Sequence, residues 1–177
     1  MSWQQEILDF WFGLSSEQHW KADPAIDAAC RERFLDIWEG QRSRPATDFL
    51  DSPEEALAAI LLFDQMPRNM FRGDARSFAT DKLARDIADG AVERGYDAKL
   101  PVERRIFLYM PFEHSEDLAD QDRSVALFEA LGDDFYTGFA RKHRDVIARF
   151  GRFPHRNAVL GRASTEAETE FGLEPAW

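Results

Sequence analysis

Three prolines divide most of the chain into segments of nearly equal length. Pro67, Pro111 and Pro154 are 44 and 43 residues apart, and each follows an apolar run with helical spacing. The residue before a proline is disfavoured in helical geometry, so we expect a helix to end at each of the three positions. Charged or amide side chains follow each proline directly. A repeat of this length is typical of stacked helix pairs.

Start and stop signals between these prolines predict the helices. Asp23-Pro24 and Ser52-Pro53 each place an N-cap residue before a proline at the first helical position, and glycine closes several of the apolar runs. The signals predict helices over residues 3–12, 24–40, 53–66, 75–94, 101–110, 115–131 and 134–150, with a capping box at Thr165 and Glu168. A buried strand is the alternative for residues 106–110, but the charged residues before them favour a helix.

No segment of the chain shows sustained polar-apolar alternation, and no Asn-Gly hairpin signal is present. We therefore predict an all-α fold of stacked antiparallel helix pairs. No linker composition interrupts the sequence, so residues 1–177 are predicted to form a single domain. If the pairs stack regularly, the three polar corners after the prolines fall on one edge.

Composition excludes several classes of protein. The net charge of −11 argues against general nucleic-acid binding, which depends on cationic surface. No apolar run is long enough for a membrane span, and residues 1–6 lack the positive start of a secretory signal, so a cytoplasmic location is expected. Cys30 is the only cysteine, which excludes an intrachain disulfide. Residues 140–162 carry six arginines and one lysine against one acid, a local excess that could attract an anion.

The polar corners supply candidate ligand-binding residues. Guanidinium groups fork two hydrogen bonds onto a carboxylate or phosphate, so arginines around a cleft would hold an anionic small molecule or an acidic or C-terminal peptide. The alternative is structural, with the arginines paired inside the fold to Asp64, Asp81, Glu113 or Glu116. The candidate residues are Arg68, Asn69, Arg72, Glu113, His114, Arg152, His155, Arg156 and Asn157.

Histidines beside carboxylates raise two further hypotheses. His155 or His114 with Glu113 could act as a general base in a hydrolase, with arginines stabilising developing charge. The segment Glu113-His114-Ser115-Glu116, together with His143 and His155, could also suit a metal ion, but His-x-x-x-His and His-Glu-x-x-His spacings are absent. Ser115 is better explained as a helix cap than as a nucleophile. We predict no metal and no cofactor.

Several blocks of the sequence resemble one known family. They are residues 64–73, 78–81, 107–116, 150–157 and 160–165, and together with the flanking segments they span most of the chain. The sequence is similar to the bacterial family catalogued as domain of unknown function 924, whose members resemble tetratricopeptide-like helical proteins. The resemblance therefore implies the helix pairs expected above, arranged as a tetratricopeptide-like right-handed superhelix. It implies no activity, substrate or catalytic residue.

Overall fold

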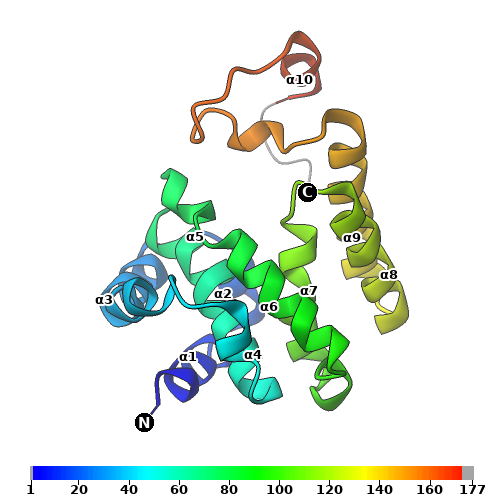
Figure 1. Cartoon of the computed structure of the whole chain (residues 1–177). Helices are drawn as coiled ribbons and strands as arrows, with labels where there is room; N and C mark the ends of the chain where they lie inside the picture. The colour runs from blue at the N-terminus through cyan, green and yellow to red at the C-terminus, as the bar shows by residue number, and fades with distance from the viewer. Residues whose placement is uncertain (1, 173–177) are drawn as a thin grey trace. The chain divides into compact units, whose positions relative to one another are not determined.

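A computed structural model describes residues 2–172 of the chain, and every regular element in that range is a helix. Figure 1 shows these helices coloured along the chain. They form two compact units, Met1–Pro111 (unit 1) and Phe112–Trp177 (unit 2). The predicted all-α architecture of packed helix pairs is confirmed. That the whole chain behaves as one domain stays a prediction.

Unit 1 is built around a short apolar helix, α4, that packs against α1 and α6, while α3 packs against α5. Ser52 caps α4 by accepting a hydrogen bond from the backbone N–H of Glu55, as its sequence predicts. Helix α2 was missed by the sequence analysis, although Ser15 and Gln18 form a capping box at its start. The α-helices that lie wholly in unit 1 are α1 (Trp3–Phe12), α2 (Ser16–Trp20), α3 (Pro24–Gln41), α4 (Pro53–Ile60), α5 (Met66–Met70) and α6 (Asp81–Glu93).

Pro67 does not end its helix, so that prediction was wrong. A π-helical segment, Leu61–Gln65, joins α4 to α5, and Pro67 lies inside α5. A proline has no N–H to give to the carbonyl four residues earlier, which here belongs to Phe63. The hydroxyl of Thr80 donates to that carbonyl at 2.6 Å, and Thr80 also accepts from Trp38 Nε1 at 3.1 Å. A side chain from the next helical segment thus replaces the missing backbone donor.

Pro111 likewise lies inside a helix, α7 (Val102–Glu113), which continues two residues beyond it. The prediction of a helix end before Pro111 was therefore wrong. Free carbonyls at the end of a helix need donors. The side-chain amide of Gln121 supplies them, donating to Glu113 O at 2.6 Å and Ser115 O at 2.7 Å.

Two other boundaries differ from the prediction. The helix expected over residues 75–94 is divided into a 3-10 turn, Ala75–Phe78, and α6. Asp117, rather than Ser115, is the N-cap of the following helix, because its carboxylate accepts from the N–H of Ala119. Ser115 instead donates its hydroxyl to Asp120 at 2.7 Å.

Unit 2 consists of a helix hairpin followed by a loop and a short helix. Gly132 adopts a left-handed conformation at φ 78°, which ends the first helix and lets the chain reverse within two residues. The two long helices, α8 (Leu118–Leu131) and α9 (Asp134–Phe150), pack against each other. A 3-10 turn, η5 (Pro154–Arg156), and α10 (Glu166–Phe171) follow.

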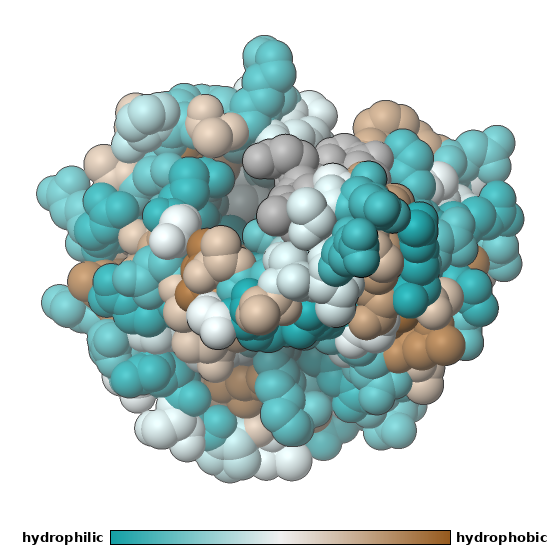
Figure 2. All heavy atoms as spheres, turned by 90° about the horizontal axis from the view of Figure 1, so that it is seen from above, coloured by the Kyte–Doolittle hydropathy of each residue, from teal (hydrophilic) through white to brown (hydrophobic). Residues whose placement is uncertain are grey.

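Polar side chains predominate on one face of the protein (Figure 2). Figure 2 shows one face on which hydrophilic residues predominate and hydrophobic residues form small, scattered groups. In the part of the chain that the structure describes, no helix is both long and apolar enough to cross a membrane.

Candidate functional site

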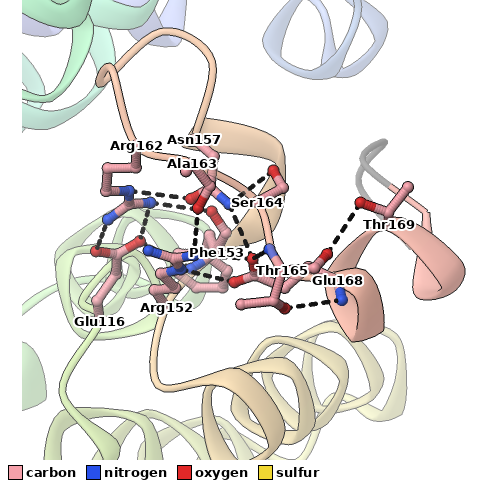
Figure 3. A network of polar contacts seen from close by, with 10 residues as sticks. All are labelled: Glu116, Arg152, Phe153, Asn157, Arg162, Ala163, Ser164, Thr165, Glu168 and Thr169. Carbon is pink, nitrogen blue, oxygen red and sulfur yellow. Dashed lines mark hydrogen bonds and ion pairs between the residues drawn. The ribbon is translucent and has the colours of Figure 1, made fainter.

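The second and third polar corners of the sequence come together in unit 2, as Figure 3 shows. The backbone N–H of Phe153 donates to Glu116 at 2.8 Å, and Arg162 donates to both carboxylate oxygens of Glu116 at 2.7 and 3.0 Å. Burial opposes ionisation of Glu116, but the hydrogen bonds from Arg162 and Phe153 outweigh it, so the pKa lies below its usual value. The loop after α9 is thereby fastened to the loop after α7.

A second fork fastens the same loop to α10. Arg152 donates to Glu168 from Nε at 2.6 Å and from Nη2 at 2.8 Å. The hydrogen bonds from Arg152, joined by one from the backbone of Thr165, lower the pKa of Glu168 to about 2. Thr165 and Glu168 also form the predicted capping box of α10. Asn157 completes the network by donating to Ser164 and Glu168 at 3.1 and 3.2 Å (Figure 3).

These forks position the short η5 turn. Gly151, at φ 67°, ends α9 in the left-handed region, where a residue with a side chain would be strained. The chain is then extended at Phe153 before it enters η5, which carries His155 and Arg156. The local sequence Gly-Arg-Phe-Pro therefore ends one helix and starts the turn that bears two of the candidate residues.

The carboxylate of Glu113 at the end of α7 contacts His143 of α9, with 3.4 Å between Oε1 and Nδ1. Both side chains are buried. His143 Nδ1 also lies 2.9 Å from the backbone oxygen of Phe139, and because a carbonyl only accepts, Nδ1 must carry the hydrogen. Burial lowers the pKa of His143 to about 3, so the imidazole is neutral at neutral pH.

Three further side chains surround this pair. The rings of His143 and His155 lie 5.7 and 5.5 Å from the ring of Phe153. The charges of His114, Arg156 and His155 add to the effect of burial and lower the pKa of His143 further. Arg156 is 7% exposed and lies over the ring of Phe153 at 4.5 Å, whereas His114 and His155 are half-buried. We call Glu113, His114, His143, His155 and Arg156 the histidine cluster.

The first polar corner lies in unit 1, and its arginines are bonded inside that unit. Arg68 forks onto Asp81 at 2.9 and 3.0 Å and lies 3.3 Å from Asp64. Burial works against the charge of Arg68, but Asp64 and Asp81 more than compensate and raise its pKa. Arg72 forks onto Asp27 at 2.7 and 2.8 Å and donates to Asn69. That this corner shares an edge with the other two stays a prediction.

The candidate residues of the sequence thus fall into two groups. Arg68, Asn69, Arg72, Arg152 and Asn157 take part in internal hydrogen-bond networks. Glu113, His114, His155 and Arg156 belong to the histidine cluster.

Sequence reasoning offered His155 or His114 as the partner of Glu113, which stays a prediction, and the structure shows a contact of Glu113 with His143. His143 is seven residues before Phe150, on the side of α9 that also carries Phe139 and Ile147, so its helical position could have indicated burial. Among the described residues, no group of three or more His, Cys, Asp and Glu side chains is arranged to hold a metal ion.

An all-α protein with a buried histidine-carboxylate pair is the class that this fold and site define. Residues 7–175 match the family described as "Bacterial protein of unknown function (DUF924)", and the chain belongs to that family. A solved structure, the protein of unknown function ATU0120 from Agrobacterium tumefaciens, is 41% identical to it, with a TM-score of 0.90 and 95% of each chain covered. A search of curated proteins gave no match.

Proposed function

We propose that unit 2 binds a small anion, a carboxylate or a phosphate, at the histidine cluster. The observation that supports this most strongly is the gathering of Arg156 and two half-buried histidines around one buried Glu113–His143 pair. A buried guanidinium beside imidazoles is a donor-rich environment, and charge-assisted hydrogen bonds to an anion are the strong ones. The ligand would be a small molecule or the carboxylate of a peptide.

The two arginines of the Phe150–Asn157 block have different parts in this proposal. Arg152 is fully engaged by Glu168 and by the backbone oxygen of Ala163, so it holds the loop in place. Arg156 lies on the next turn, beside His143 and over Phe153, and is the arginine that would contact the anion. The pair therefore offers a matched comparison within five residues of sequence.

Titration with acetate and with inorganic phosphate, followed by amide chemical shifts in NMR, tests this proposal. Wild-type protein is expected to show saturable shifts in residues 113–116, 143 and 153–157. Arg156→Met should weaken binding by about tenfold or more, since a hydrogen bond to a charged group contributes roughly 1.5–3 kcal/mol. Arg152→Met should bind with nearly wild-type affinity but melt at a lower temperature.

A half-exposed histidine provides a second variant that is less prone to unfold the protein. His155→Asn removes the ring while keeping a polar side chain, and is expected to weaken anion binding by a smaller factor than Arg156→Met. Shifts that never saturate in wild-type protein, or equal affinities in wild type and both variants, would remove the histidine cluster as the binding site.

A hydrolase is the alternative, and the contact between Glu113 and an imidazole is the observation that favours it. His143 itself would be a weak base at neutral pH because its pKa is so low. His155, which is half-buried, is the better candidate base. Purified protein assayed against ester, phosphoester and amide substrates should then lose activity in His155→Ala. Activity that survives this change would exclude the assignment.

A further inference from the structure

Two buried polar atoms of helix α8 lack hydrogen-bond partners among the described residues. They are Oε1 of Gln121 and Oγ of Ser124, and both side chains are 0% exposed. A buried polar atom without a partner costs roughly 1–3 kcal/mol, so such atoms are rare and ask for an explanation. Gln121 and Ser124 lie three residues apart, on the same face of α8.

Contacts of the neighbouring residues place this face beside the histidine cluster. The amide nitrogen of Gln121 donates to the backbone oxygen of Glu113 at 2.6 Å, so its Oε1, on the same amide group, lies close to Glu113 as well. Arg144 of α9 donates to Asp122 of α8 at 2.8 Å, which sets residues 121–124 level with the part of α9 that carries His143. The unpaired atoms and the cluster therefore belong to one polar region of unit 2.

The chemistry of these atoms differs from that of the cluster. Gln121 Oε1 can only accept a hydrogen bond, and a serine hydroxyl accepts as well as donates. Arg156, by contrast, can only donate. An anion alone could accept from the arginine but would leave the amide oxygen of Gln121 without a donor.

We propose that the ligand of unit 2 is a small carboxylic acid that also carries a hydroxyl or ammonium group, with Gln121 Oε1 and Ser124 Oγ receiving that group. This inference rests on the proposed anion site and specifies the second half of its ligand. The carboxylate would lie toward Arg156, and the O–H or N–H donor toward α8 and the carboxylate of Glu113. A site with buried acceptors discriminates strongly against an analogue that lacks the donor, because those acceptors then remain unpaired.

The competing occupant is a buried water molecule, which needs two to four polar partners and would satisfy the same atoms. If a water molecule stays in place, the site would bind acids with and without a hydroxyl or ammonium group with the same affinity. The two possibilities therefore differ in a measurable selectivity.

The test compares propionate with lactate, 3-hydroxypropionate and alanine in the same NMR titration of the full chain. At least one of the three donor-bearing acids is expected to bind about tenfold or more tightly than propionate, the ratio that one well-made buried hydrogen bond gives. Ser124→Ala should reduce that ratio to about threefold or less. Tighter binding of lactate than of alanine would identify a hydroxyl as the donor group. Tighter binding of alanine would identify an ammonium group.

Thr137→Val provides the matched control, because it removes another buried hydroxyl, one that already donates to Asp133 O within α9. This variant should retain the wild-type ratio. If all four acids bind wild type equally, or if Ser124→Ala leaves the ratio unchanged, the inference is overturned while the anion site stands. If none of the four binds, the proposed function itself fails. If Ser124→Ala does not fold, the affinities of the four acids for wild-type protein still decide whether the inference holds.

Discussion

The buried side chains of units 1 and 2 differ in polarity. Buried apolar residues far outnumber buried polar ones in unit 1, where α4 and the segment after it form a continuous apolar run from Ala56 to Phe63. In unit 2 the ratio is reversed among the described residues. Its seven buried apolar side chains are Phe112, Phe128, Ala140, Val146, Ile147, Phe153 and Pro154, against nine polar ones, Glu113, Asp120, Gln121, Ser124, Thr137, His143, Arg156, Asn157 and Glu168.

This difference implies different sources of stability. Apolar burial contributes roughly 25 cal/mol per Å² and depends little on pH, so unit 1 should tolerate a wide pH range. Unit 2 instead relies on charges and hydrogen bonds that hold only in one protonation state. A core with so many polar groups contributes little hydrophobic stability. Its hydrogen bonds can nevertheless hold a small number of side chains in fixed positions.

Acidification should therefore unfold unit 2 before unit 1, and this is the largest effect we expect. His143 stays neutral in the folded state down to about pH 3, whereas in the unfolded chain its imidazole has the ordinary histidine pKa of 6.5 and takes up the proton much earlier. The unfolded state thus binds more protons in this window, and stability is lost as the pH falls from 6.5 towards 3. The full loss is about 5 kcal/mol, and hydrogen exchange of α8 and α9 at a series of pH values measures it.

His143→Asn is the control for this prediction, because Asn keeps an N–H donor near the Nδ1 position and cannot ionise. The variant should hold the exchange protection of α8 and α9 nearly constant between pH 6.5 and about 4. Below pH 4.5, protonation of Glu168, whose pKa is lowered to about 2, should release α10 in wild type and variant alike. Equal loss of protection in the two proteins above pH 4.5 would show that His143 is not responsible.

Within unit 1, we expect the largest loss of stability from a change to a buried polar side chain. Thr80→Val keeps the shape of the side chain but removes the hydroxyl that serves both Phe63 O and Trp38 Nε1. Two buried groups would be left unpaired, at roughly 1–3 kcal/mol each, so we expect a loss of about 2–4 kcal/mol in urea unfolding.

Pro67→Ala in the Thr80→Val background tests the reason for that loss. Alanine at position 67 restores a backbone N–H four residues after Phe63, and its hydrogen bond to Phe63 O should recover about 1 kcal/mol. In the wild-type background the same change should add little stability, since the hydroxyl of Thr80 already donates to that carbonyl. Identical effects of Pro67→Ala in both backgrounds would contradict the link between Pro67 and Thr80.

The two prolines also show how far the sequence could predict the fold. Several helix starts were predicted correctly, because caps such as Asp23, Ser52 and Thr165 act within three residues of their own position. Helix ends at Pro67 and Pro111 were predicted wrongly. The groups that permit these helices to continue, Thr80 and Gln121, are distant in sequence, and no local rule identifies them.

The site shows the same limit. The Phe150–Asn157 block and the corner at Glu113 could be recognised from their residue types, and the structure brings these two corners together in unit 2. Whether a given arginine is internally paired could not be predicted, because Arg152 meets Glu168 across 16 residues and Arg162 meets Glu116 across 46. The contact of His143 with Glu113 likewise depends on which side of α9 faces the end of α7.

The smallest expected effect is an absence of change, and it tests whether the units respond separately. Cys30, the only cysteine of the chain, is buried in unit 1, and burial, with a smaller contribution from Asp27, raises its pKa to about 12. The thiol should therefore resist maleimide labelling at pH 7.5 unless unit 1 opens.

Arg152→Met loosens unit 2 by freeing Glu168, and we expect its melting temperature to fall by roughly 5 °C. Its Cys30 labelling rate should nevertheless equal that of wild type, whereas Thr80→Val should accelerate labelling. Faster labelling in Arg152→Met would mean that unit 1 depends on unit 2, and that the contrast in their buried side chains does not separate their stabilities.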